Sequence, residues 1–141
     1  DSKDAAVAAL IRSMQKVNRK GCSTNKGFYD YKDNKKLKLW HGLKDLIPPS
    51  NKQPEISFVE KRLLFSCINN MLYNYTNIFK NNDQNLFDYL SITKMSLPTW
   101  TGGPFSWIKN FNVKKFNIVN KEFEKSQGSR FIVDQKLLDS I

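Results

Sequence analysis

The sequence predicts an all-α fold built around one long central helix. Apolar residues recur at spacings of three and four along most of the 141-residue chain, as they do on the buried side of a helix. Asp, Pro and Gly residues interrupt these runs at positions where helices commonly begin or end. Apolar residues make up 40% of the chain, which is enough for a contiguous core. We therefore expect a globular helical protein without a β-sheet.

The first predicted helix covers residues 4–18, and Asp4 stands where its side chain can cap the first turn. The apolar side of this helix consists of Val7, Leu10, Ile11, Met14 and Val17. Loop-forming residues follow at 19–25, and residues 27–31 are predicted to be a short extended segment.

A charged turn is predicted at residues 32–38, followed by a short helix at 39–47. Pro48 and Pro49 end that helix, because proline disfavours helical backbone at its own position and at the residue before it. A linker then continues to about Pro54. We expect residues 1–54 to hold the N-terminal helix, a junction loop and this linker, and residues 55–141 to form a helical repeat.

The long central helix is predicted over residues 56–80, where apolar side chains cover a broad face. These side chains are Val59, Leu63, Leu64, Cys67, Ile68, Met71, Leu72, Tyr75 and Phe79. Residues 81–83 predict a turn with an N-cap, and residues 86–92 predict a second helix that packs against the first.

The remainder of the chain is predicted to form shorter helices after a Pro- and Gly-rich break at residues 97–104. Pro104 suits the first turn of a helix that continues to Ile108, and residues 113–125 predict another amphipathic helix. Gly128 suits the C-cap of that helix. The last predicted turn is capped by Asp134 and carries Leu137, Leu138 and Ile141.

Three segments carry motifs in a fixed order. The first is a Gly-Phe-Tyr-x-Tyr sequence, and the second begins with Arg-Leu-Leu in the long helix. The third places an Asp ten residues before a Pro, and a Gly-Gly-Pro-Phe run follows that Pro. The motif residues are Gly27, Phe28 and Tyr29 in the first segment, Arg62 and Asn69 in the second, and Asp88, Pro98, Gly102, Gly103, Pro104 and Phe105 in the third.

In this order and spacing, the segments resemble the C-terminal domain of the 3-hydroxyacyl-CoA dehydrogenase family. The resemblance covers residues 8–141, because Gly128–Phe131 and Leu137–Asp139 are similar to the end of the second repeat in multifunctional members. It implies the second, catalytically silent copy of that helical domain. The third motif is expected to serve packing, with unusual backbone angles at Gly102 and Gly103 and with Trp100 and Phe105 anchoring the loop.

Departures from the family pattern also imply a catalytically silent copy. Lys61 stands where the first copy of the domain carries an Asn that assists catalysis, and Lys94 and Ser96 replace two glycines. Cys22 and Ser23 replace an Arg-Lys pair of the junction. The resemblance therefore implies a repeat that has no catalytic duty.

The resemblance also implies what surrounds this segment. The nicotinamide site and the catalytic His and Glu of the family belong to an upstream Rossmann domain, so we expect NAD in the parent enzyme and no cofactor here. The parent would oxidise L-3-hydroxyacyl-CoA in fatty-acid β-oxidation. Its expected partners are the upstream dehydrogenase domains of the same chain, an enoyl-CoA hydratase domain and a thiolase subunit. Isolated, the module is expected to form a homodimer through the long helix.

No residues of this segment are predicted to be catalytic or to bind a metal. His41 is the single histidine, and Cys22 and Cys67 are too far apart in the chain to complete a standard four-ligand set. We expect two free thiols in a reducing, cytoplasmic compartment, and no segment is apolar enough to span a membrane. The first residues have neither a Met nor a signal sequence, so we expect a fragment of a longer protein.

The net charge of +10 favours an alternative function, a standalone basic, aromatic-rich module for RNA or another acidic polymer. Lysines and aromatic residues alternate at 29–38 and at 109–123. Of the 23 basic residues, however, 19 are Lys, and Asn is frequent. This composition is typical of an AT-rich bacterial genome and predicts a diffuse charge without a nucleic-acid partner.

Overall fold

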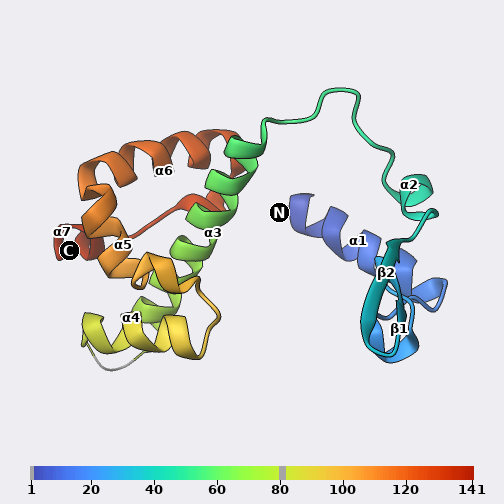
Figure 1. Ribbon diagram of the computed structural model, residues 1–141. Coiled ribbons are helices and arrows are strands. Elements are labelled where there is room, and N and C mark those ends of the chain that lie inside the picture. The colour runs from blue at the N-terminus through green and yellow to red at the C-terminus, as the bar shows by residue number, and fades with distance from the viewer. Residues whose placement is uncertain (1, 80–81) are drawn as a thin grey trace. The chain divides into compact units, whose positions relative to one another are not determined.

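The computed structural model describes residues 2–79 and 82–141, which form two compact units. The first unit ends at Gln53 and the second begins at Pro54. A segment without helix or strand joins the last helix of the first unit to the first helix of the second (Figure 1). In the described residues, no helix combines the length and the apolar character that crossing a membrane requires.

The first unit consists of helices and a β-hairpin. Helix α1 (Ser2–Lys16) is followed by a 3-10 turn at Cys22–Thr24, by strands β1 (Tyr29–Lys32) and β2 (Lys35–Leu39), and by the short helix α2 (Leu43–Leu46). Helices are present within the predicted ranges 4–18 and 39–47, but α1 begins and ends two residues earlier than predicted, and α2 begins four residues later and ends one residue earlier because Leu39 belongs to β2. The side chain of Asp4, the predicted cap, lies outside the described residues.

The expectation of a protein without a sheet was wrong at this hairpin. Strands β1 and β2 pair antiparallel, with Tyr29 opposite Leu39 and Lys32 opposite Lys35. Residues 32–38, predicted as a turn, contain most of β2. Asp33 and Asn34 both have positive φ (50° and 61°), as the two central residues of a tight type I′-like hairpin turn require.

The second unit is all helical in its described residues, and α3 (Ile56–Asn77) is its longest element. It is followed by α4 (Gln84–Thr93), a 3-10 turn at Thr99–Thr101, α5 (Pro104–Phe111), α6 (Val113–Gln127), a 3-10 turn at Ser129–Phe131 and α7 (Gln135–Asp139). In Figure 1, α4 lies beside the C-terminal half of α3 and α6 beside its N-terminal half. Ring contacts of Tyr75 with Phe87 and of Phe65 with Phe123 agree with that arrangement.

The predicted helix ends are largely confirmed in the second unit. Asp83 caps α4 by accepting hydrogen bonds from two backbone N–H groups, and Asp134 caps α7 in the same way with one. Pro104 is the first residue of α5, and Gly128 is the C-cap of α6. Lys80 and Asn81, at the predicted end of the long helix and start of the next turn, lie outside the described residues.

Aromatic side chains form most of the core of the second unit. Phe65 of α3 has ring contacts with Trp107, Phe111, Phe116 and Phe123, with ring centroids 5.1–5.7 Å apart. Such pairs add about 0.5–1.5 kcal/mol each beyond the burial of their area. The ten phenylalanines of the chain thus serve largely to fill the space between short helices.

Candidate functional site

The third motif forms one interlocked structure at the start of α5. The carboxylate of Asp88, on α4, accepts hydrogen bonds from the backbone N–H groups of Phe105 (2.8 Å) and Ser106 (2.9 Å) and from the Ser106 hydroxyl (2.7 Å). These N–H groups belong to the first turn of α5, where a helix has no internal acceptors and carries partial positive charge. Asp88 is only 5% exposed, so this carboxylate holds α4 and α5 together.

The backbone conformation of this loop and its close contact with Asp88 require the two glycines of the motif. Gly102 has φ of 72° and Gly103 has φ of 106°, both in the region that disfavours side chains. A Cβ atom added at Gly103 would lie 2.3 Å from the Cβ of Asp88. The Thr101 hydroxyl completes the turn, because it donates to the Pro98 carbonyl and accepts from the Gly103 N–H.

One anchor of this loop was predicted correctly and one was not. Phe105 is buried in the core, where its ring lies 4.7 Å from that of Tyr75. Trp100, in contrast, is 69% exposed, so its predicted anchoring role was wrong. Leu97 is the buried apolar residue on that side of the loop. Three-residue helical turns rotate side chains by about 120° each, and only structure shows which one faces inward.

The second motif contributes a buried polar network. Asn69 Nδ2 donates to Asn120 Oδ1 at 2.7 Å, and Asn120 Nδ2 donates to the Phe131 carbonyl. Because a carbonyl only accepts, this chain of bonds fixes the orientation of both amides. Asn69 Oδ1 is then left without a partner, as is Arg62 Nε. The sequence analysis did not predict Asn120, because its partner Asn69 lies 51 residues away on another helix.

The first motif surrounds a buried cation that the sequence analysis missed. Arg19 donates to the Gly27 carbonyl at 2.8 Å, forms an ion pair with Asp30 at 2.6 Å and stacks on Trp40 at 4.4 Å from the ring centroid. The Arg19 hydrogen bond lowers the pKa of Asp30 below its ordinary value. An Arg eleven residues before an Asp across a Gly-rich loop was the available signal.

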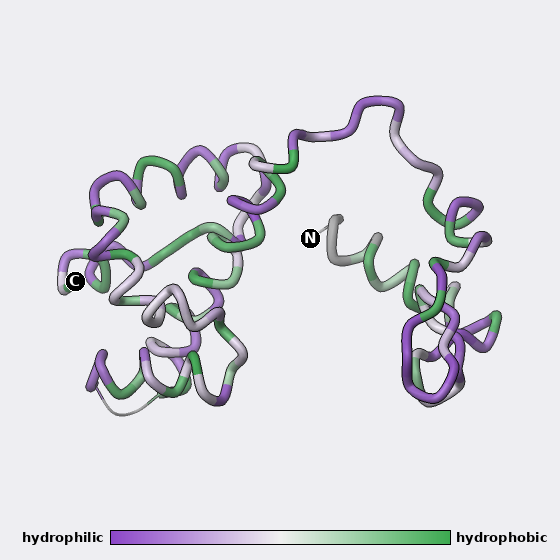
Figure 2. The backbone as a smooth tube through the Cα atoms, viewed as in Figure 1, coloured by the Kyte–Doolittle hydropathy of each residue, from purple (hydrophilic) through white to green (hydrophobic). Residues whose placement is uncertain are grey.

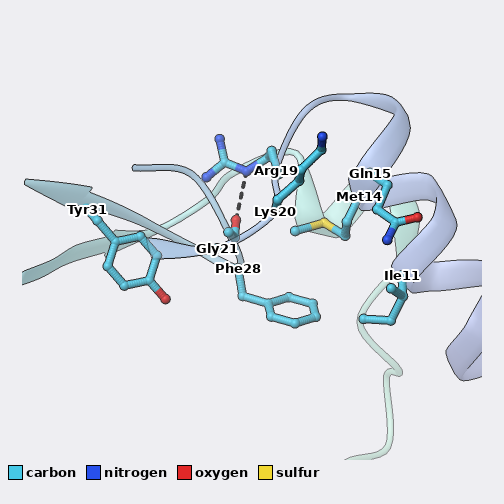
Figure 3. Close-up of a pocket in the computed structure, with 9 residues that line it drawn as sticks. Ile11, Met14, Gln15, Arg19, Lys20, Gly21, Phe28 and Tyr31 are labelled. Atoms are coloured by element: carbon cyan, nitrogen blue, oxygen red, sulfur yellow. Dashed lines mark hydrogen bonds between the residues drawn. The ribbon is translucent and has the colours of Figure 1, made fainter. Parts of the chain in front are cut away.

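A pocket of about 240 Å³ lies next to Arg19 in the first unit. Figure 3 shows the Phe28 ring extending toward Met14 and Ile11, and its dashed line marks the Arg19 to Gly27 hydrogen bond. The walls are mainly apolar, and the polar groups at its edge are those of Gln15 and Lys20, with Tyr31 on the side of the hairpin. No Ser, Cys, His, Asp or Glu side chain lines this pocket.

The outward side of α3 exposes two aliphatic residues of the predicted broad face. Ile56 and Leu63 are seven residues apart and therefore lie on the same side of the helix, and Cys67 continues that side one turn later. The exposed Glu60 lies between Ile56 and Leu63 on this side, and the exposed Asn70 follows Cys67. On this side of α3 the uncovered apolar surface is thus a narrow stripe, because Phe65, Ile68 and their neighbours fill the core; Phe58 and Tyr73 are the other exposed apolar residues of the helix.

Groups that could perform catalysis do not converge in the described residues. His41 is exposed, and no three His, Cys, Asp or Glu side chains in residues 2–79 and 82–141 gather as a metal site. The motif residues of the second unit lie on helices and in a loop held by one carboxylate, and those of the first unit surround Arg19. What the arrangement offers is rigid packing and exposed surface.

No protein-family model matches the chain, and no curated protein is significantly similar to it.

Proposed function

We propose that this chain is a non-catalytic helical interaction module of an NAD-dependent L-3-hydroxyacyl-CoA dehydrogenase, equivalent to the second helical repeat of multifunctional fatty-acid oxidation enzymes. The observation that supports the proposal is the carboxylate of Asp88 on the first turn of α5. The widely spaced residues of the third motif, on which the resemblance depends most, have a common physical reason to occur together in that structure. If the match to the motif were a coincidence, there would be no reason for its residues to lie together in the structure.

The position of Asp88 also bears on whether this segment could bind a dinucleotide. A pyrophosphate binds at a helix N-terminus that follows a Gly-rich turn, and the one such turn in the sequence is Gly102-Gly103-Pro104. Asp88 already occupies that N-terminus with a negative charge. These residues therefore do not fit NAD, and we assign the cofactor to the upstream domain of the proposed parent enzyme.

An interaction role is supported by the outward stripe of α3. Exposed aliphatic side chains on a helix gain about 25 cal/mol for each Å² that a partner covers. We propose that Ile56 and Leu63 pack on the upstream dehydrogenase domains of the same chain. In an isolated module, a second copy would take that place. A thiolase subunit is a further proposed partner, to which we assign no surface.

The alternative as an RNA-binding module loses one of its two supports. The aromatic residues of the segment 109–123 that were expected to stack on bases include Phe116 and Phe123, and both are buried in the core. Their lysine neighbours are ordinary exposed residues of α6. Of the two segments, the hairpin of the first unit is the one that retains exposed aromatic and basic groups together.

The experiment that tests the proposal is to determine the complete transcript that encodes this chain. We expect a Gly-x-Gly-x-x-Gly strand-turn-helix unit upstream, followed by a first helical repeat. A start codon directly before the Asp1 codon, itself preceded by in-frame stop codons, would contradict the proposal. As a second readout, the purified chain should not oxidise 3-hydroxybutyryl-CoA with NAD, and measurable turnover would contradict its non-catalytic role.

A further inference from the structure

The positive charge of the protein is concentrated in the first unit. Residues 1–53 hold 12 of the 23 basic residues but only 5 of the 13 acidic ones, a net charge of +7. Residues 54–141 hold the remaining 11 and 8, a net charge of +3. The expectation of a diffuse charge was therefore wrong. Figure 2 shows that hydrophilic residues dominate the β1–β2 hairpin, where four lysines lie within seven positions.

Strand β2 is uncovered on both of its faces. All five residues of Lys35–Leu39 are exposed, and Leu37 and Leu39 are 61% and 48% exposed. The register of the hairpin shifts between Tyr29 and Tyr31, so β2 is irregular opposite them, and Leu37 and Leu39 lie two residues apart in that irregular part of the strand. The lysines of β2 are long enough to extend around its open edge. The hairpin thus presents adjacent aliphatic groups surrounded by ammonium groups.

Acidic groups on the hairpin neutralise little of this charge. Asp30 is engaged by Arg19, which leaves Asp33 in the turn as the other carboxylate of residues 29–39. Cationic side chains also cover the rings of Tyr29 and Trp40 on one face. Lys36 Nζ lies 5.0 Å from the centroid of the Tyr29 ring, and Arg19 lies over Trp40. One face of each ring is therefore already covered by a cation, which disfavours stacking of nucleic-acid bases.

We infer that the β1–β2 hairpin binds the surface of an anionic lipid bilayer. Leu37 and Leu39 enter the boundary between headgroups and acyl chains, while Lys32, Lys35, Lys36 and Lys38 contact lipid phosphates. Only a bilayer surface offers negative charge and an apolar layer within a few ångströms, and that combination matches the hairpin. A polynucleotide would satisfy the lysines and leave the leucines in water. This inference is independent of the proposed function.

The binding is expected to be weak and dependent on salt. Each Lys near an anionic surface contributes about 1 kcal/mol, and the attraction decays over roughly 8–10 Å at physiological ionic strength. The two exposed leucines add to the binding free energy when their side chains are buried in the bilayer. Peripheral and reversible association follows, which needs no membrane-spanning helix.

The test is co-sedimentation of the whole chain with vesicles of equal parts phosphatidylglycerol and phosphatidylcholine, compared with pure phosphatidylcholine. Two hairpin variants separate the contributions: Leu37→Ser with Leu39→Ser, and Lys35→Gln with Lys36→Gln and Lys38→Gln. The matched control changes three exposed lysines of α6, Lys114→Gln, Lys121→Gln and Lys125→Gln. Because every residue of β2 is exposed, the variants should keep the wild-type circular dichroism and melting temperature.

We expect binding to the anionic vesicles alone, a roughly hundredfold weaker partition for the triple Lys variant, and about tenfold for the Leu variant. The α6 control should retain most of the binding. The inference is overturned if the wild type does not sediment with anionic vesicles, or if the α6 control loses as much binding as the hairpin variants. It is also overturned if a single-stranded RNA oligonucleotide binds the chain at a salt concentration at which the vesicles do not.

Discussion

Asp88 and Gly103 are in such close contact that a Cβ atom at Gly103 would stand 2.3 Å from the Asp88 Cβ. The carboxylate beyond that Cβ binds the next two backbone N–H groups of the chain after Pro104. Asp88 can therefore accept these hydrogen bonds because Gly103 has no side chain. This relationship explains why an Asp on one helix and a Gly-Gly-Pro-Phe run that begins fourteen positions later belong together.

The first prediction concerns this contact. Gly103→Ala should destabilise the second unit by more than the roughly 1–3 kcal/mol of backbone strain alone, because the added methyl group also displaces Asp88. Gly102→Ala is the matched control, since its φ is also positive but its nearest neighbour is the Ser106 Cβ at 3.3 Å. Thermal melting should show a clearly larger loss for Gly103→Ala. Equal losses would mean that the Asp88 contact is unimportant.

The carboxylate itself provides the second prediction. Asp88→Asn turns an acceptor of three hydrogen bonds into a group with a donor facing buried N–H groups, and it should cost about 2–3 kcal/mol in urea unfolding. Asp83→Asn should be nearly neutral, because Asn and Asp are equally good at an exposed N-cap. If both variants unfold at the wild-type urea concentration, the charge of Asp88 does not hold α5.

Acid should destabilise the first unit through Asp30. The Arg19 hydrogen bond lowers the pKa of Asp30 below its ordinary value of 3.8, so the folded state binds this proton less readily than the unfolded state. The stabilisation is complete above that ordinary pKa and is lost as the pH falls through the lower folded value. Asp30→Asn should remove this part of the pH dependence. A carboxyl titration of Asp30 by NMR with a midpoint at or above 3.8 would contradict the ion pair.

The amide network of Asn69 and Asn120 provides a fourth prediction. Asn69→Leu leaves Asn120 Oδ1 buried without a donor and should cost about 1–3 kcal/mol. Asn120→Leu should have a similar or larger effect, since the Phe131 carbonyl also loses its donor. In a double-mutant cycle the losses should be less than additive, because the two variants remove one shared bond. Additive losses would show that the two amides do not interact.

Helix positions could be predicted from the sequence wherever a local chemical signal marks them. Asp83, Asp134 and Gly128 each act on backbone groups within a few residues, so their capping roles follow from their neighbours. The hairpin was missed because Lys-rich strands that are exposed on both faces have no apolar alternation to detect. Its turn signal, Asp33-Asn34, resembles an ordinary polar loop.

Residues that act across long sequence distances could be predicted only in part. Asp88 and Gly103 were recognised as a pattern, but the hydrogen bonds that join them depend on how α4 and α5 pack. Asn120 carries no sequence pattern, and the spacing of Arg19 and Asp30 is only a weak one, since the partners of both residues lie on other elements. The outward stripe of α3 was predicted too broad, because most of the apolar residues of the helix were needed to cover the aromatic core.

The most direct measurement for an interaction module is the association state of the isolated chain, determined by light scattering over a range of protein and salt concentrations. Dimers are expected at high micromolar protein and should strengthen with added salt, which screens the net charge of +10. Leu63→Asp should give a folded monomer, because a carboxylate buried in the interface would have no partner. Ile118→Asp is the matched control, since Ile118 on α6 is 62% exposed and Leu63 is 58% exposed, and it should remain dimeric. A wild-type monomer in low and moderate salt, or equal behaviour of the two variants, would contradict the assignment of the α3 stripe as the interaction surface.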